Sequence, residues 1–190
     1  MTTTISAVID ACVLHSASQR DFILRLAFAG LFHPLWSEKI RDEWFSSLLR
    51  RRPDLEREKI ERTCRKMDFH FPYSLVRGYE SIIPNLQLPD EDDKHILAVA
   101  IYMKAKYIVT ANLSDFPLPI LASYQVVAIS PDDFALRVVK YDANKFIDTV
   151  ARHRAALSRP PQTVDEYLAT LEQQKLHKTV AFLRKHNDKI

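Results

Sequence analysis

The chain has 190 residues, of which 47% are apolar, and a formal net charge of +3 at pH 7. This length and apolar content predict one full hydrophobic core with an appendage, and so small a charge neither establishes nor opposes a nucleic-acid partner. With only 2 Gly and 2 Cys, the sequence excludes a glycine-rich nucleotide-binding loop and a disulfide framework.

The first elements alternate between strand and helix. A near-continuous apolar run over residues 4–9 is typical of a strand buried in a parallel sheet. Residues 18–21 resemble a capping box and predict the start of a helix, which Gly30 is placed to end in a left-handed turn. A short strand over residues 31–35 is expected next.

Two helices with a proline between them are expected to follow. Ser37 predicts the N-cap of a helix whose apolar stripe includes Ile40 and Trp44. After the proline, Asp54 is expected to begin a helix of mixed charge. A weak strand is then expected around residues 69–71.

The middle of the chain completes the pattern of a parallel sheet. The acidic run at 90–93 predicts a helix start, and strands are expected at 106–110 and 126–129. Ser130 begins a strong helix opening, with proline in the first turn. This alternation predicts a three-layer α/β fold, in which helices flank a parallel sheet of four or five strands.

The character of the sequence changes near residue 135, where helical patterns continue without strands. We expect a core domain over residues 1–134 and a helical extension over 135–190 packed on it, with a capping box at 163–166. No basic-then-apolar leader and no apolar run of membrane length is found. A cytoplasmic protein without a membrane partner is therefore expected.

Four acidic residues fall where such a sheet would bring them together. Asp10 closes the first strand, Asp115 follows the strand at 106–110, Asp93 opens a helix, and Glu43 flanks the apolar stripe of another. Ligands of open α/β sheets bind beyond the carboxyl ends of the strands. Clustered carboxylates repel each other unless a cation neutralises them, and their oxygens favour Mg²⁺ or Mn²⁺. The constellation thus indicates metal-assisted phosphodiester chemistry.

Each acid taken alone has a structural explanation. The helix dipole alone accounts for Asp93, Asp115 suits a turn, and Glu43 suits a solvated helix flank. Asp10 is the hardest to explain in this way, because a carboxylate directly after a buried strand is desolvated at a cost in free energy unless it is paired. The functional hypothesis therefore depends on all four acids together.

Four segments resemble the acidic motifs of PIN domains, in the order of that family. They are VIDAC at 8–12, RDEW at 41–44, DDKHILAVA at 92–100 and IVTANLSDF at 108–116. Within the family, the chain is most similar to the VapC-type toxins of bacterial toxin–antitoxin pairs. This resemblance implies a Mg²⁺-dependent endoribonuclease (with Mn²⁺ as the other candidate ion), an RNA substrate, an antitoxin partner and a homodimer.

The resemblance also assigns roles by position. It implies catalytic and metal-binding roles for four acids, and supporting roles for three polar neighbours: Asp10, Glu43, Asp93 and Asp115, with Asp92, Thr110 and Asn112 beside them. Some relatives carry an acid where this chain has Asn112, so Asp115 has to serve as the fourth acid. His95 is expected to be a surface or packing residue, and not a ligand.

Other functions and other roles stay open at this point. The alternatives are a PIN nuclease acting in RNA processing or on structured DNA, and a module without metal that only binds RNA or protein. Basic residues at 50–52 and 57–66 are candidates for holding RNA, and a plain solvated surface explains them equally well. The expected helix at 38–51 is apolar on a second side, at Phe45 and Leu49, which either a homodimer, an antitoxin segment or the C-terminal helices would cover.

Overall fold

The computed structural model describes residues 5–190, and its centre is a five-stranded sheet in which every pair of neighbours is parallel. In spatial order the strands are β3 (Leu75–Val76), β2 (His33–Ser37), β1 (Ser6–Ile9), β4 (Tyr107–Val109) and β5 (Val127–Ile129). Val8 of β1 lies between Leu35 of β2 and Ile108 of β4. The predicted parallel α/β sheet is confirmed, and Thr4, the first residue of the expected strand, lies outside the described residues.

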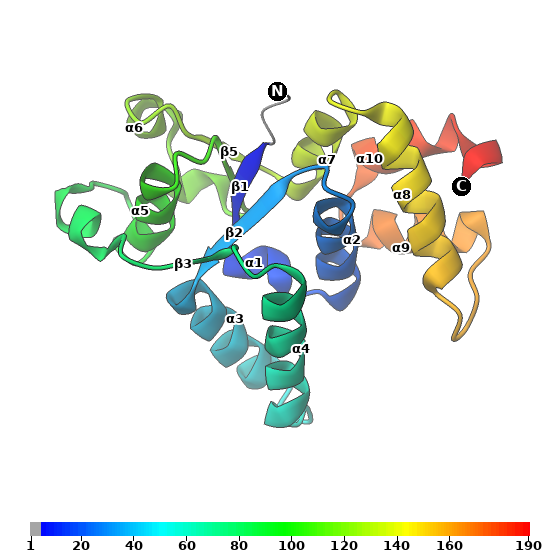
Figure 1. Ribbon diagram of the computed structural model, residues 1–190, viewed down its shortest axis with the longest axis horizontal. Coiled ribbons are helices and arrows are strands. Elements are labelled where there is room, and N and C mark those ends of the chain that lie inside the picture. Colours follow the sequence, from blue (N-terminus) through cyan, green and yellow to red (C-terminus); the bar gives the residue numbers. More distant parts are fainter. Residues whose placement is uncertain (1–4) are drawn as a thin grey trace.

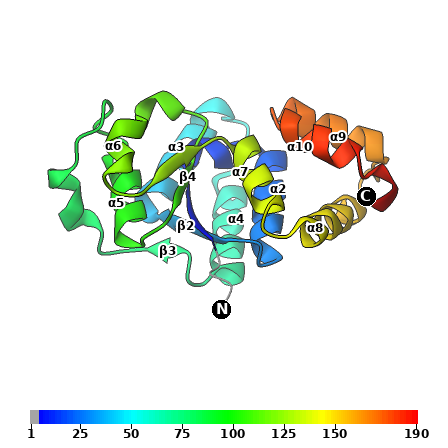
Figure 2. The ribbon, with the colours of Figure 1, turned by 90° about the horizontal axis from the view of Figure 1, so that it is seen from above.

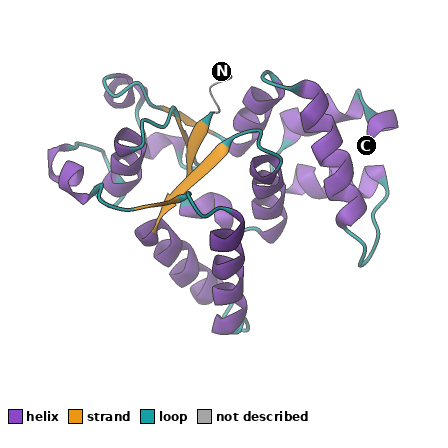
Figure 3. Cartoon of the chain, viewed as in Figure 1, coloured by secondary structure: helices purple, strands orange, loops and turns teal. Residues whose placement is uncertain are grey.

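Helices cover both faces of this sheet. Figure 2 shows α5 (Lys94–Tyr102) and α6 (Leu118–Ala122) on one side, with α2 (Ala17–Phe28) and α7 (Pro131–Val139) on the other. The short α1 (Ala11–Leu14) follows β1 directly, and α3 (Glu38–Arg51) with α4 (Arg57–His70) forms a helical hairpin that projects from the sheet in Figure 1. Strands, helices and loops are distinguished in Figure 3. Short 3-10 helices lie at Glu80–Asn85, Leu113–Asp115 and Asn187–Lys189.

Local capping explains where several helices begin. The Ser37 hydroxyl accepts a hydrogen bond from the Ile40 amide at 3.2 Å, which confirms the predicted N-cap of α3. Gly30 has a φ of +72°, a left-handed conformation that other residues rarely adopt, and it follows the end of α2 as predicted. The capping box expected at 18–21 is wrong, because Ser16 caps α2 through the Gln19 amide.

The segment around α4 differs from its prediction in two ways. Asp54 does not begin the helix, because its carboxylate pairs with Arg52 at 2.6 Å in the connecting turn, and α4 starts at Arg57. The weak strand expected at 69–71 is also wrong: Phe69 belongs to the last turn of α4, and the strand lies further on, at β3. Burial of Ile60 and Met67 on one helical face keeps this segment helical.

Three helices form the C-terminal extension: α8 (Ala143–Ala156), α9 (Val164–Gln173) and α10 (His177–Arg184). The expected division between residues 134 and 135 falls inside α7, which runs from the end of β5 towards the extension. The predicted capping box at 163–166 is confirmed at the start of α9. Within residues 5–190, no helix is long and apolar enough to cross a membrane.

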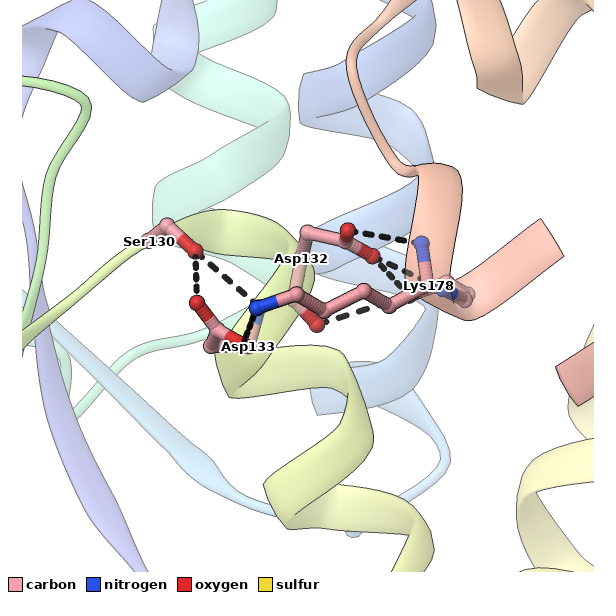
Figure 4. A network of polar contacts seen from close by, with 5 residues as sticks. Ser130, Asp132, Asp133 and Lys178 are labelled. Atoms are coloured by element: carbon pink, nitrogen blue, oxygen red, sulfur yellow. Dashed lines mark hydrogen bonds and ion pairs between the residues drawn. The ribbon is translucent and has the colours of Figure 1, made fainter. Parts of the chain in front are cut away.

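A buried carboxylate joins the extension to α7 (Figure 4). Asp132 is 8% exposed and accepts hydrogen bonds from the Lys178 amide at 2.8 Å, the Thr179 amide at 2.8 Å and the Thr179 hydroxyl at 2.7 Å. It therefore satisfies the first amides of α10, which otherwise have no partner within the helix. Asp133 binds the Lys178 ammonium at 2.5 Å and the Ser130 hydroxyl at 2.8 Å.

A second buried chain of polar groups joins the extension to α2. The imidazole of His153 lies 2.9 Å from the Tyr167 hydroxyl and 3.0 Å from the Asp21 carboxylate. The hydrogen bond from His153 lowers the pKa of Asp21, with further contributions from the charges of His153 and Arg25. Each of the two junctions is thus held by hydrogen-bonded carboxylates as well as by apolar packing.

The second apolar side of α3 faces its hairpin partner. The Arg57 guanidinium of α4 lies 4.9 Å from the centre of the Phe45 ring, and Leu49 is partly buried. In Figure 1 the hairpin is well separated from α8, α9 and α10, which pack beside α2 and α7. The alternative in which the C-terminal helices cover α3 is therefore wrong.

Candidate active site

Asp10 is the most deeply placed of the four predicted acids. It follows β1 directly, serves as the N-cap of α1, and is only 6% exposed. The Thr110 hydroxyl, at the end of β4, donates to Asp10 Oδ2 at 2.6 Å, and the Cys12 thiol donates to the same oxygen at 3.0 Å. Asp10 Oδ1 receives only a long contact from the Cys12 amide, at 3.4 Å. One carboxylate oxygen is thus well bound, and the other keeps capacity for a ligand.

Cys12 takes part in a way that the sequence did not indicate. Burial, followed by the charge of Asp10, raises the pKa of the Cys12 thiol to about 12. Cys12 therefore remains a protonated donor to Asp10 near neutral pH, and its sulfur accepts a hydrogen bond from the Ala111 amide at 3.2 Å. The spacing of two residues between Asp10 and Cys12 is the sequence feature that could have suggested this contact.

Asp93 shows that the four acids are close enough to interact. It is half-buried at the N-cap of α5 and makes no capping hydrogen bond with its side chain. Burial, followed by the charges of Asp10, Asp90, Asp115 and Glu43, raises its pKa from 3.8 to about 7. The residues named from sequence thus share one electrostatic field, together with Asp90, which the sequence analysis did not select.

Glu43 contacts a histidine that the sequence analysis set aside. Nε2 of His95 lies 2.9 Å from Glu43 Oε1, although the angle is unsuitable for a hydrogen bond, and His95 is 1% exposed. His95 is therefore a buried packing residue, and the surface alternative is wrong. The ammonium of Lys39 lies 4.0 Å from the same Glu43 oxygen. Glu43 is thus held between a buried imidazole and a surface lysine.

The remaining predicted residues lie further out. Asp115 is half-buried in the turn after β4 and accepts a hydrogen bond from the Ser114 hydroxyl at 3.2 Å. Asn112 is exposed and contacts the site through its backbone amide, which donates to the Thr110 hydroxyl at 3.0 Å. Asp92 is exposed, and its amide donates to Asp90 at 2.9 Å.

The donor set fits a hard divalent cation. Within residues 5–190, no three His, Cys, Asp or Glu side chains are already at ligating distance from a common point. A cation would therefore have to draw Asp93, Glu43 or Asp115 towards Asp10. After burial, the repulsion by neighbouring carboxylates raises the pKa of Asp93, and such an ion would cancel this repulsion.

Comparison with known sequences decides the family. Residues 6–114, more than half of the chain, match the sequence model of the PIN domain. The chain belongs to the PIN domain family. Residues 131–185 of this PIN protein match a second model, described as the VapC50 C-terminal domain.

One curated relative is similar over part of its length. A stretch of 59 residues is 50% identical to the protein named "Putative ribonuclease VapC50" from Mycobacterium tuberculosis (strain ATCC 25618 / H37Rv). This stretch covers 31% of the present chain and 34% of that relative, so the match spans about a third of each. No solved structure matches the chain.

Proposed function

We propose that this PIN protein is a Mg²⁺-dependent endoribonuclease, acting as the toxin of a toxin–antitoxin pair. The observation that carries the proposal is the buried Asp10 beside Asp93, whose pKa is raised by burial and by the surrounding carboxylates. A protein with no use for a cation gains nothing from such repulsion. The ribonuclease name of the partial relative supports RNA as the substrate.

The four acids would have different roles in this reaction. Asp10 and Asp93 would hold the cation, and Glu43 with Asp115 would complete its shell or orient the attacking water. When bound, Mg²⁺ polarises the scissile phosphate and lowers the pKa of a bound water. Thr110 and Cys12 fix one oxygen of Asp10, so that the other points to a single place.

Exposed aromatic groups support the proposal of a protein partner. Phe28, Phe69 and Tyr73 are 63%, 81% and 83% exposed, and Phe28 and Phe69 both pack against the ring of His70. Large apolar side chains grouped at a surface mark sites of association. An antitoxin, a second copy of the chain in a homodimer, or both in turn would cover this surface, and such a pair would act in the cytoplasm.

Cleavage assays test the catalytic proposal directly. The purified chain should cut RNA in Mg²⁺ and lose this activity in EDTA. Asp10→Asn should reduce the rate by at least about 100-fold, the scale seen when one group that stabilises transition-state charge is removed. Asp165→Asn makes the same chemical change at an exposed residue of α9 and should leave the rate unchanged. Cleavage that survives EDTA or Asp10→Asn would overturn the proposal.

A further inference from the structure

A cleft between the helical hairpin and the junction of α1 with α2 carries only basic charge. It has a volume of about 580 Å³. We name it the basic cleft after the side chains at its rim: His15, Arg20, Arg51, Arg52 and Lys59. Its floor is apolar and includes Trp44, Leu48, Leu55 and Ile60. Within the described chain, no Asp or Glu lines it.

The basic cleft begins next to the acidic site. Helix α1 starts at its N-cap, Asp10, and ends at its C-cap, His15, so the two residues are about 7.5 Å apart along the helix axis. Burial and then the charge of Arg51 lower the pKa of His15, and the charge of Asp10 opposes them. His15 is therefore within electrostatic reach of both the acidic site and the cleft. Its buried Nε2 has no hydrogen-bond partner in residues 5–190.

Two cations of the cleft are available to a ligand in different ways. The Arg20 guanidinium is fixed, because it donates to the Leu14 carbonyl at 2.6 Å and lies 5.0 Å from the Trp44 ring. Arg51 is exposed and forms no ion pair within the described residues. Arg52 and Lys59 at the mouth are paired, with Asp54 and Glu56.

The three arginines of α4, which lie outside the cleft, differ from Arg51. Arg57 and Arg65 both pair with Glu61, and Arg62 pairs with Glu58, along the surface of the same helix. Such exposed pairs leave little net charge for a polyanion. Of the basic residues at 50–66 that the sequence analysis selected together, the structure thus singles out Arg51 by its place in the cleft and its lack of an ion pair.

We propose that the basic cleft binds the phosphate backbone of the RNA strand next to the scissile bond, with Arg51 contacting one phosphate. This inference rests on the proposed ribonuclease function. An acidic active site repels the strand that it must cut, so cations immediately beside it are needed to hold neighbouring phosphates. The apolar floor can accommodate the faces of riboses and bases.

Salt-dependent binding tests this assignment. Binding of a short fluorescein-labelled oligouridylate is measured by anisotropy in EDTA, between about 50 and 200 mM salt. Loss of one phosphate contact in Arg51→Gln should reduce the slope of log K against log salt by about 0.7, and raise Kd about fourfold near 0.15 M salt. Arg50→Gln removes the same charge from the neighbouring exposed residue, outside the cleft, and should behave as wild type.

Kinetics separate a failure of this inference from a failure of the proposed function. In Mg²⁺, Arg51→Gln should raise KM severalfold and leave kcat unchanged, because Arg51 lies outside the acidic site. Equal salt slopes and equal KM for Arg51→Gln and wild type would overturn the cleft assignment, even while cleavage still depended on Asp10. Release of a bound protein partner by Arg51→Gln, with RNA binding unchanged, would assign the cleft to that partner and also overturn it.

Discussion

Two aspartates with nearly equal burial, Asp10 in the acidic site and Asp132 in the junction between α7 and α10, have very different surroundings. Asp10 is 6% exposed and Asp132 is 8% exposed. Both oxygens of Asp132 accept short hydrogen bonds, from the first turn of α10. At Asp10 one oxygen is bound and the other is nearly free, with further carboxylates nearby. Burial alone therefore does not distinguish the two acids, whereas incomplete hydrogen bonding among like charges does, and this is the property expected of a functional acid.

Asp10→Asn provides the largest expected contrast between the two regions. Besides losing activity, this variant should fold normally, because Asn can still accept from Thr110 and the charge that repels Asp93 is gone. Its melting temperature in the absence of metal should equal or exceed that of the wild type. A melting temperature several degrees lower would mean that Asp10 serves the fold, and the contrast with Asp132 would fail.

Asp132→Asn should show the opposite behaviour. The side-chain nitrogen of the new asparagine would face another donor, either the backbone amide of Lys178 or Thr179. An unsatisfied buried group of this kind lowers the free energy of unfolding by about 2 kcal/mol. For a chain of this size, that corresponds to a fall of about 4–8 °C in melting temperature. Cleavage by the remaining folded protein should be unchanged, as measured well below the transition. Lost activity with an unchanged melting temperature would place Asp132 in the catalytic machinery.

Tyr167→Phe tests the second junction with a smaller expected effect. It removes the hydroxyl that lies 2.9 Å from His153 and leaves the ring packed, which should lower the free energy of unfolding by about 1 kcal/mol. Tyr141→Phe deletes the same atom from a side chain that is 55% exposed, and should change nothing. Urea denaturation of both variants measures the difference. Equal stability for the two would show that the His153 contact does not hold the extension.

The smallest expected effect is the pH dependence of Asp93. Its pKa is raised from 3.8 to about 7 in the folded, metal-free protein, so the folded state binds this proton more tightly than the unfolded chain does. The resulting contribution to stability is fully present below pH 3.8 and is lost as the pH rises through 7. Solvent screening of this half-exposed group keeps the effect small. Between pH 5 and 7.5 the urea midpoint should fall less in Asp93→Asn than in the wild type. An equal fall in both would contradict the raised pKa of Asp93.

Features that depend on nearby residues were predictable from the sequence. The N-caps at Ser37, Ser130 and Thr163 were identified correctly, because capping joins residues only three positions apart. The approach of Asp10 to Thr110 spans 100 residues, but it follows from two adjacent parallel strands that end together. The sequence pattern and the sheet topology therefore made most of the fold predictable, together with the approach of Asp10 to Thr110.

Features that depend on the choice of a distant partner were not predictable. The start of α4 was missed for a different, local reason: nothing in the sequence pattern indicates that Asp54 pairs with the nearby Arg52 and does not cap the helix. The contact between His95 and Glu43 joins α5 to α3, and no periodicity specifies it. The basic cleft is a similar case, because Arg50 and Arg51 look alike in the sequence and only helix packing distinguishes them.

The central position of β1 has a consequence for hydrogen exchange. β1 has a hydrogen-bonded neighbour on each side, and the Asp10 amide itself donates to the Val109 carbonyl at 3.1 Å. Amides of such a strand exchange with solvent only in the rarest and largest openings, whereas the turn that carries Asp115 opens far more readily. The Asp115 carboxylate is therefore expected to leave and return many times while Asp10 stays in place. Exchange of a bound cation would then be a local event on a rigid anchor, at a rate set by the turn that carries Asp115.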